Sequence, residues 1–228
     1  MTYHHHVRSE ISPLLPATAD RIVDVGCSAG VTLAWLKQRY PSAYTIGLEA
    51  NIALKLDILQ NADEARIVDV TKEIPDLGKP DLMLFLDVLE HLPDPMRVLL
   101  QLTSQLAPSG TIIVSLPNVA HLSIAIPLIL RGEFSYRDAG ILDRTHLKFF
   151  VRESAVALVR DAGFRVDRGL MGGIDGVKSR LADAITCHCM RSRLAKQFIL
   201  RGIRDDKKAS TPVKWDLARY PRYDLPRK

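Results

Sequence analysis

Four acidic side chains stand at the ends of four apolar runs. Asp24 lies in IVDVG, Glu49 ends IGLE, Asp69 lies in IVDV and Asp87 follows LFL. Because ligands of parallel sheets bind outside the carboxyl ends of the strands, we expect these acids to border one site. Glu49 is placed to accept hydrogen bonds from both hydroxyls of a ribose. Asp69 is placed to accept one from the exocyclic amine of an adenine.

The loop after the first run, GCSAG (26–30), contains only small residues. Small residues let the backbone approach a ligand closely, and Gly30 leads into a helix whose free N–H groups can face a polar group. Neither the dinucleotide pattern G-x-G-x-x-G nor the phosphate loop G-x-x-x-x-G-K-[ST] is present. We expect Asp24 to fix this loop by accepting its backbone N–H groups. Cys27 is interpreted as a small apolar filler rather than a nucleophile.

Apolar runs alternate with helical patterns along the chain. The expected strands are 21–26, 43–49, 65–70, 81–88, 110–118, 165–171 and 196–203, and the expected helices are 31–40, 51–60, 93–110, 119–134 (kinked or broken at Pro127) and 152–164. This alternation predicts an α/β fold: a Rossmann-like, doubly wound, mostly parallel seven-stranded sheet with helices on both faces. Residues 1–204 would form one domain, followed by a basic C-terminal tail at 205–228.

The segments VDVGCSAG, IGLEA, IVDV, LFLDVLEHLPDP and GTIIVSLPN resemble, in order and spacing, class I S-adenosylmethionine-dependent methyltransferases. The resemblance covers about residues 20–170, with a cofactor half at about 20–118 and an acceptor-side segment at about 119–150. It implies S-adenosyl-L-methionine as the cofactor. The implied cofactor-binding residues are Asp24, Gly26, Cys27, Ser28, Gly30, Glu49, Asp69, Val70 and Asp87. Ser28 stands where the family has its middle glycine.

The segment LDRTHLKFF (142–150) resembles a bacterial subgroup of these enzymes, many of whose members methylate small hydroxylated acceptors. Methyl transfer to oxygen needs a base for the hydroxyl proton, and His is suited to this near pH 7. His146 is our candidate base, with Asp143 orienting it or binding the acceptor. In a purely structural alternative, Asp143 pairs with Arg144 and His146 caps the loop. His91, in EHLPDP, is the second candidate.

The N-terminal segment YHHHVRSEISPLLP also resembles that subgroup. Arg8 would then reach the cofactor carboxylate as a bidentate partner, although a surface arginine is the simpler interpretation. The HHH and CHC runs, at 4–6 and 187–189, do not supply the ligand sets that metal sites require, so no metal is predicted.

Composition sets the broad class. Of 228 residues, 47% are hydrophobic and 25% are charged, which is typical of a soluble globular protein. The longest apolar run, Leu122 to Leu130, is too short for a membrane span. With an odd number of cysteines, three, and no secretory signal, a cytoplasmic protein is expected.

The predicted activity is O-methylation of a small molecule or of a glycan- or lipid-linked precursor, with no nucleic acid partner and a possible homodimer. From Lys178 onward the chain holds 14 Lys and Arg against 5 Asp and Glu. This basic end leaves RNA or protein methylation open as an alternative. A non-catalytic, cofactor-binding partner protein is the other alternative.

Overall fold

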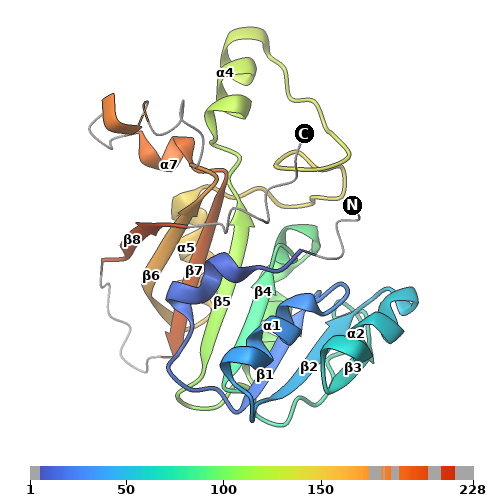
Figure 1. Ribbon diagram of the computed structural model, residues 1–228. Helices are drawn as coiled ribbons and strands as arrows, with labels where there is room; N and C mark the ends of the chain where they lie inside the picture. Colours follow the sequence, from blue (N-terminus) through green and yellow to red (C-terminus); the bar gives the residue numbers. More distant parts are fainter. Residues whose placement is uncertain (1–5, 175–180, 182, 186–189, 205–211, 219–228) are drawn as a thin grey trace.

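The computed structural model describes residues 6–174, 181, 183–185, 190–204 and 212–218. Its centre is one mixed sheet (Figure 1) with the strand order β3-β2-β1-β4-β5-β7-β6-β8. The strands are β1 (Arg21–Val25), β2 (Tyr44–Glu49), β3 (Glu64–Ile67), β4 (Leu82–Leu86), β5 (Thr111–Pro117), β6 (Phe164–Gly172), β7 (Gln197–Arg204) and β8 (Lys214–Leu217). The first five are parallel, and β7 runs antiparallel to β5 and β6.

Helices cover both faces of the sheet, as the sequence predicts. The 3-10 helix η2 (Ser9–Leu14), α1 (Val31–Arg39) and α2 (Lys55–Asn61) contribute to one buried cluster. The helices α3 (Pro95–Thr103) and α5 (Arg152–Asp161) contribute to the other. Further helices are η3 (Ile52–Leu54), η4 (Leu89–His91), α4 (Leu122–Arg131) and α7 (Arg191–Leu194). The central strand β4 reads LMLFL and is buried at every position, as a strand covered on both faces must be.

The sheet has eight strands rather than the expected seven. The eighth, β8, lies in the segment that we expected to be a tail, and it pairs in parallel with β6. Its Trp215 ring packs so closely on Gly169 of β6 that a Cβ at Gly169 would lie 2.6 Å from the ring. Trp215 also makes an edge-on contact with Phe198 of β7. The packing of Trp215 on Gly169 therefore holds this four-residue strand against β6.

Two further boundaries differ from expectation. β3 ends at Ile67, so Asp69 and Val70 lie beyond the strand. The helix α4 is one uninterrupted element with Pro127 inside it. Proline removes one backbone hydrogen bond from such a helix, and here it does not break it. Within the described ranges, every helix is too short or too polar to span a lipid bilayer.

Candidate active site

The loop between β1 and α1 adopts the left-handed backbone at three positions: φ is 71° at Gly26, 52° at Ser28 and 77° at Gly30. Gly26 is required for a second reason, because a Cβ there would lie 2.9 Å from Cγ2 of Val88. The N–H groups of Gly26 and Cys27 donate to the Leu48 carbonyl at 2.8 and 3.1 Å. The loop is therefore bound to the carboxyl end of β2, with little bulk between it and the space above the sheet.

Glu49 fixes this loop from the end of β2. One carboxylate oxygen accepts from the Ser28 N–H at 3.0 Å, and the other accepts from the Asn51 N–H at 2.9 Å. Each carboxylate oxygen retains a second lone pair for a ligand hydroxyl. The left-handed backbone of Ser28 is strained, whereas a glycine would adopt it without this strain. The charge-assisted hydrogen bond from the Ser28 N–H to Glu49 offsets the strain.

Asp24 does not have the role that we expected. Its carboxyl is 3% exposed, and no loop N–H among the described residues donates to it. The expectation was wrong because Asp24 lies inside the pairing register of β1, opposite Gly47 of β2 and Leu84 of β4. Burial raises its pKa to about 7; the Arg8 charge opposes this shift and the Glu49 charge adds to it. Asp24 is thus a buried acid whose charged form a nearby cation would stabilise.

Asp69 and Val70 lie in different environments. The Asp69 carboxylate accepts from the Thr71 N–H at 3.0 Å and the Thr71 hydroxyl at 2.6 Å, and it pairs with Lys72 at 3.0 Å. These donors lower its pKa to about 2. Val70 is 8% exposed and belongs to the buried core. Cys27 is also buried, and burial raises the pKa of its thiol, which agrees with a filler and not a nucleophile.

A network that joins distant parts of the chain stands beside this loop. Arg8 donates from Nε to Glu10 at 2.5 Å and from Nη1 to Asp87 at 2.6 Å. Asp87 also accepts from the Ser115 hydroxyl at 2.7 Å and from the Gln197 side-chain amide. The Arg8 side chain is only 11% exposed, so the surface interpretation of this residue is wrong. Asp87 itself has a left-handed backbone, with φ 56°.

Truncating Arg8 removes the partner of two carboxylates, one of which, on Glu10, is 1% exposed. We expect Arg8→Ala to lower the free energy of unfolding by about 3 kcal/mol, because it leaves a buried charge unpaired. Urea unfolding at pH 7 measures this loss. Glu10→Gln in the Arg8→Ala background should restore part of it by removing that charge. A loss below about 0.5 kcal/mol, as for a surface ion pair, would contradict the network's structural role.

His146 lies on the acceptor side of the same region. It is 8% exposed, and its Nδ1 lies 3.0 Å from the Ile141 carbonyl oxygen. A carbonyl only accepts, so Nδ1 carries the proton and Nε2 of the neutral ring is free to take one. Burial lowers the pKa of this imidazole, which favours the neutral form. Nε2 lies 4.0 Å from Oε1 of Glu90, a residue of η4 that is 1% exposed.

Asp143 does not contact the His146 ring. Its Oδ1 accepts from the Thr145 N–H at 2.8 Å and from the Thr145 hydroxyl at 2.6 Å, and these bonds close the turn before His146. Asp143 thus bears on His146 through the backbone of this turn, and its expected orienting role stays a prediction. The alternative pairing with Arg144 is not made either, because Arg144 pairs with Asp138 at 2.8 Å.

His91 is the neighbour of His146, with ring centroids 4.7 Å apart and the planes at 74°. Its Nδ1 lies 3.2 Å from the Thr145 carbonyl oxygen and 3.0 Å from the Thr145 hydroxyl. One ligand atom from each of Glu90, His91 and His146 lies within 4.8 Å of the others, a spacing that also suits a metal ion. Burial and the charge of Asp87 raise the Glu90 pKa well above its usual range. No described residue forms a hydrogen bond with its Oε2.

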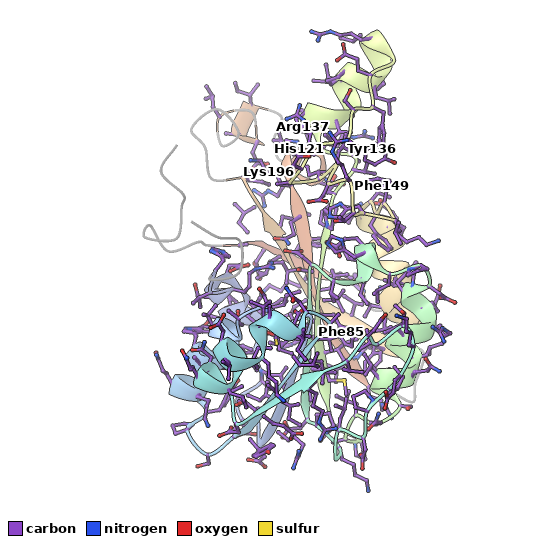
Figure 2. The ribbon with its side chains drawn as sticks, turned by 90° about the vertical axis from the view of Figure 1, so that its right-hand side faces the viewer. Phe85, His121, Tyr136, Arg137, Phe149 and Lys196 are labelled. Carbon is purple, nitrogen blue, oxygen red and sulfur yellow. The ribbon has the colours of Figure 1, made fainter. Side chains whose placement is uncertain are left out.

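A group of aromatic side chains lies next to His146, on the side away from the sheet. Phe149 lies 6.5 Å from the His146 ring, 5.5 Å from Phe134 and 6.2 Å from Tyr136, between centroids. Figure 2 places Tyr136 and Phe149 at the end of the molecule that also carries His121. The sequence motif LDRTHLKFF thus brings a basic imidazole and an aromatic surface together at the end of the sheet where the acids lie.

The fold defines the class of protein: the chain carries a Rossmann-like methyltransferase domain. The family model described as a methyltransferase domain matches residues 3–168. The chain belongs to that family.

Two curated relatives indicate how far the likeness extends. Trans-aconitate 2-methyltransferase of Deinococcus radiodurans is 32% identical over 119 residues, 50% of this chain and 45% of that protein. Ubiquinone biosynthesis O-methyltransferase of Stutzerimonas stutzeri is 28% identical over 173 residues, 69% of this chain and 73% of that protein. The chain spans less than half the length of the trans-aconitate methyltransferases that it matches.

Solved structures support the fold. A SAM-dependent methyltransferase from Archaeoglobus fulgidus matches with a TM-score of 0.59 at 19% identity, over 85% of this chain and 89% of that one. An S-adenosylmethionine-dependent methyltransferase from Mesorhizobium loti also gives a TM-score of 0.59, at 14% identity, over 85% of this chain and 95% of that one. At such identities the likeness concerns the fold alone.

Proposed function

We propose that this protein transfers a methyl group from S-adenosylmethionine to an oxygen atom of a small molecule or of a glycan- or lipid-linked precursor. The observation that carries the proposal is the His146 imidazole: its Nδ1 proton is held by the Ile141 carbonyl, and its pKa is lowered. A neutral imidazole with a free Nε2 is suited to remove a hydroxyl proton. The Stutzerimonas relative is named an O-methyltransferase, which supports oxygen as the methylated atom.

The residues present fit this cofactor. Glu49 has free lone pairs for the ribose hydroxyls, and Gly26 keeps the loop open where a Cβ would clash. The buried Asp24 carboxyl, which takes no hydrogen bond from the loop, complements the α-ammonium group. Asp69, Val70, Cys27, Ser28, Gly30 and Asp87 remain proposed members of the site. When bound, the cofactor supplies an electrophilic methyl group on a sulfonium.

The chain's own residues would then position the acceptor and move one proton. Nε2 of His146 would take the hydroxyl proton of the acceptor, whose oxygen would receive the methyl group that the bound cofactor supplies. The products would be a methyl ether, a neutral thioether and a protonated imidazole, which returns its proton to water. The Glu90 carboxyl, 4.0 Å away, is placed to stabilise that cation. Positioning supplies much of the rate in such transfers.

The reaction is tested by incubating the full chain with methyl-labelled S-adenosylmethionine and separate panels of phenols, hydroxy acids and sugar or lipid alcohols. S-adenosylhomocysteine and labelled product are measured together. Product from an oxygen acceptor supports the proposal. Labelled RNA or protein, with none of the small acceptors labelled, would contradict it and favour the alternative acceptor class. Cofactor binding without transfer to any acceptor would favour a non-catalytic partner protein.

The role of Asp24 gives a pH prediction. Its pKa is raised to about 7, so the free protein carries a neutral carboxyl below that pH and a carboxylate above it. The ammonium group favours the carboxylate, so S-adenosylhomocysteine should bind about tenfold more tightly at pH 8 than at pH 6. Calorimetric titration of the wild type and of Asp24→Asn measures this. The variant should bind with little pH dependence, and a slope that survives in it would rule out Asp24 as the titrating group.

A further inference from the structure

The helix α4 is apolar, yet the structure buries none of its residues. It reads LSIAIPLILR, and Ile126, Leu128, Ile129 and Leu130 are 48%, 44%, 79% and 75% exposed. Figure 1 shows it projecting from the sheet at the end of the molecule opposite α2. Exposed apolar patches of this kind on a folded protein mark interaction surfaces.

The exposed side chains are arranged as a stripe. Ile126, Ile129 and Leu130 lie on one face of the helix, and the partly buried Leu122, which packs on the core, begins the same face. No acidic residue interrupts the helix, and its one charged residue, Arg131, stands at the last position. A short helix with this apolar face and a basic end is of the type that lies in the plane of a lipid interface.

The surroundings of α4 are basic. The segments 119–150 and 190–196 contain seven Lys and Arg residues against three Asp and Glu. Three ion pairs cancel part of this charge: Glu133 pairs with Arg131, Asp138 with Arg144, and Asp183 with Arg191. Lys148 and Lys196 form no ion pair with any described residue and are exposed. This charge complements an anionic surface and would repel a second copy of the same end.

We propose that α4 docks on the surface of an anionic lipid bilayer. Its apolar stripe enters the boundary between headgroups and acyl chains, and the basic residues of 131–148 and 190–196 face the lipid phosphates. Apolar burial and electrostatic attraction act together in such binding, so it should weaken when either is removed. Binding of this kind is peripheral and differs from spanning the membrane.

The test is co-sedimentation of the full chain with vesicles of phosphatidylcholine containing 30% phosphatidylglycerol, set against pure phosphatidylcholine. The Ile129→Asp/Leu130→Asp variant changes two solvent-exposed side chains, so it should fold normally, as thermal unfolding and S-adenosylhomocysteine binding will verify. The matched control is Leu56→Asp/Leu59→Asp on α2, where the two side chains are 72% and 46% exposed. We expect the α4 variant to bind the anionic vesicles at least tenfold more weakly, and the control to bind as the wild type does.

Three results would overturn the proposal. The first is the absence of wild-type binding to the anionic vesicles. The second is equal binding of the wild type and the α4 variant, which would assign the attraction to the basic C-terminal sequence alone. The third is a wild-type dimer, seen by sedimentation velocity, that the α4 variant dissociates without any vesicle binding; a second copy would then cover the helix.

Discussion

Glu49→Ala is expected to weaken S-adenosylmethionine binding by at least a hundredfold. The Glu49 carboxylate is assigned two ribose hydroxyls, and hydrogen bonds to a charged group contribute about 1.5–3 kcal/mol each. Loss of both corresponds to about two to four powers of ten in the dissociation constant. The variant also frees the Ser28 and Asn51 N–H groups, so the loop itself should loosen. Calorimetric titration with S-adenosylmethionine and S-adenosylhomocysteine measures the effect.

A second acid serves as the comparison for this measurement. Asp69→Ala removes a carboxylate that is already held by Thr71 and Lys72 and is 39% exposed on its side chain. We expect a less than tenfold loss of affinity, because a solvated carboxylate has less to contribute than a half-buried one. If Asp69→Ala weakens binding more than Glu49→Ala does, the ribose contact has been assigned to the wrong strand end.

Local patterns were sufficient to predict the positions of the Glu49 carboxylate and of the loop after β1. Glu49 could be predicted because an acid at the end of an apolar run is visible within six residues of sequence. The left-handed loop at Gly26 and Gly30 was equally predictable, since a run of small residues directly after a strand is typical of a tight turn. These features depend only on neighbours in the chain, so pattern and chemistry agree with the structure.

The Arg8 network could not be predicted in the same way. Arg8 and Asp87 are separated by 79 positions, and Gln197 and Asp87 by 110. No periodicity links residues so far apart; the sheet order alone brings Gln197 at the start of β7 beside the ends of β4 and β5. Within this network, the sequence singled out only Asp87, as an acid at the end of an apolar run, and Arg8, through the resemblance of the N-terminal segment. Glu10, Ser115 and Gln197 carried no such signal.

Two errors have physical causes of their own. We expected Asp24 to bind the loop because a buried acid usually accepts hydrogen bonds from nearby backbone N–H groups. Asp24 instead lies within the register of β1, and the loop N–H groups donate to Glu49 and to the Leu48 carbonyl. The strand β8 escaped notice because four residues, KWDL, show no clear alternation. Its position depends on the fit of Trp215 over Gly169, which is a tertiary contact.

Substitution of His146 should separate chemistry from cofactor binding. We expect His146→Asn to lower kcat/KM for the acceptor by about 10²–10⁴, the usual contribution of a general base. Affinity for S-adenosylhomocysteine should stay within about threefold of wild type, because none of the cofactor contacts assigned to Glu49 or Asp24 includes this ring. Steady-state kinetics and titration on the same preparations give both quantities.

The pH profile distinguishes a base from a structural imidazole. The His146 pKa lies below its ordinary value because burial disfavours the cation, so kcat/KM should rise with pH, level off, and show its inflection below pH 6.5. That limb should vanish in His146→Asn. A structural ring would instead lower the free energy of unfolding and leave the limb in the residual activity.

His91→Asn and a chelator complete the assignment. The His91 ring lies 4.7 Å from His146, but its Nδ1 is engaged by Thr145, so we expect its loss to cost less than tenfold. The reverse ranking of the two variants would make His91 the base. Activity that survives ethylenediaminetetraacetate leaves Nε2 of His146 free for a proton. Activity that the chelator abolishes and a divalent ion restores would instead make Glu90, His91 and His146 ligands, since a nitrogen bound to a metal has no lone pair left to act as a base.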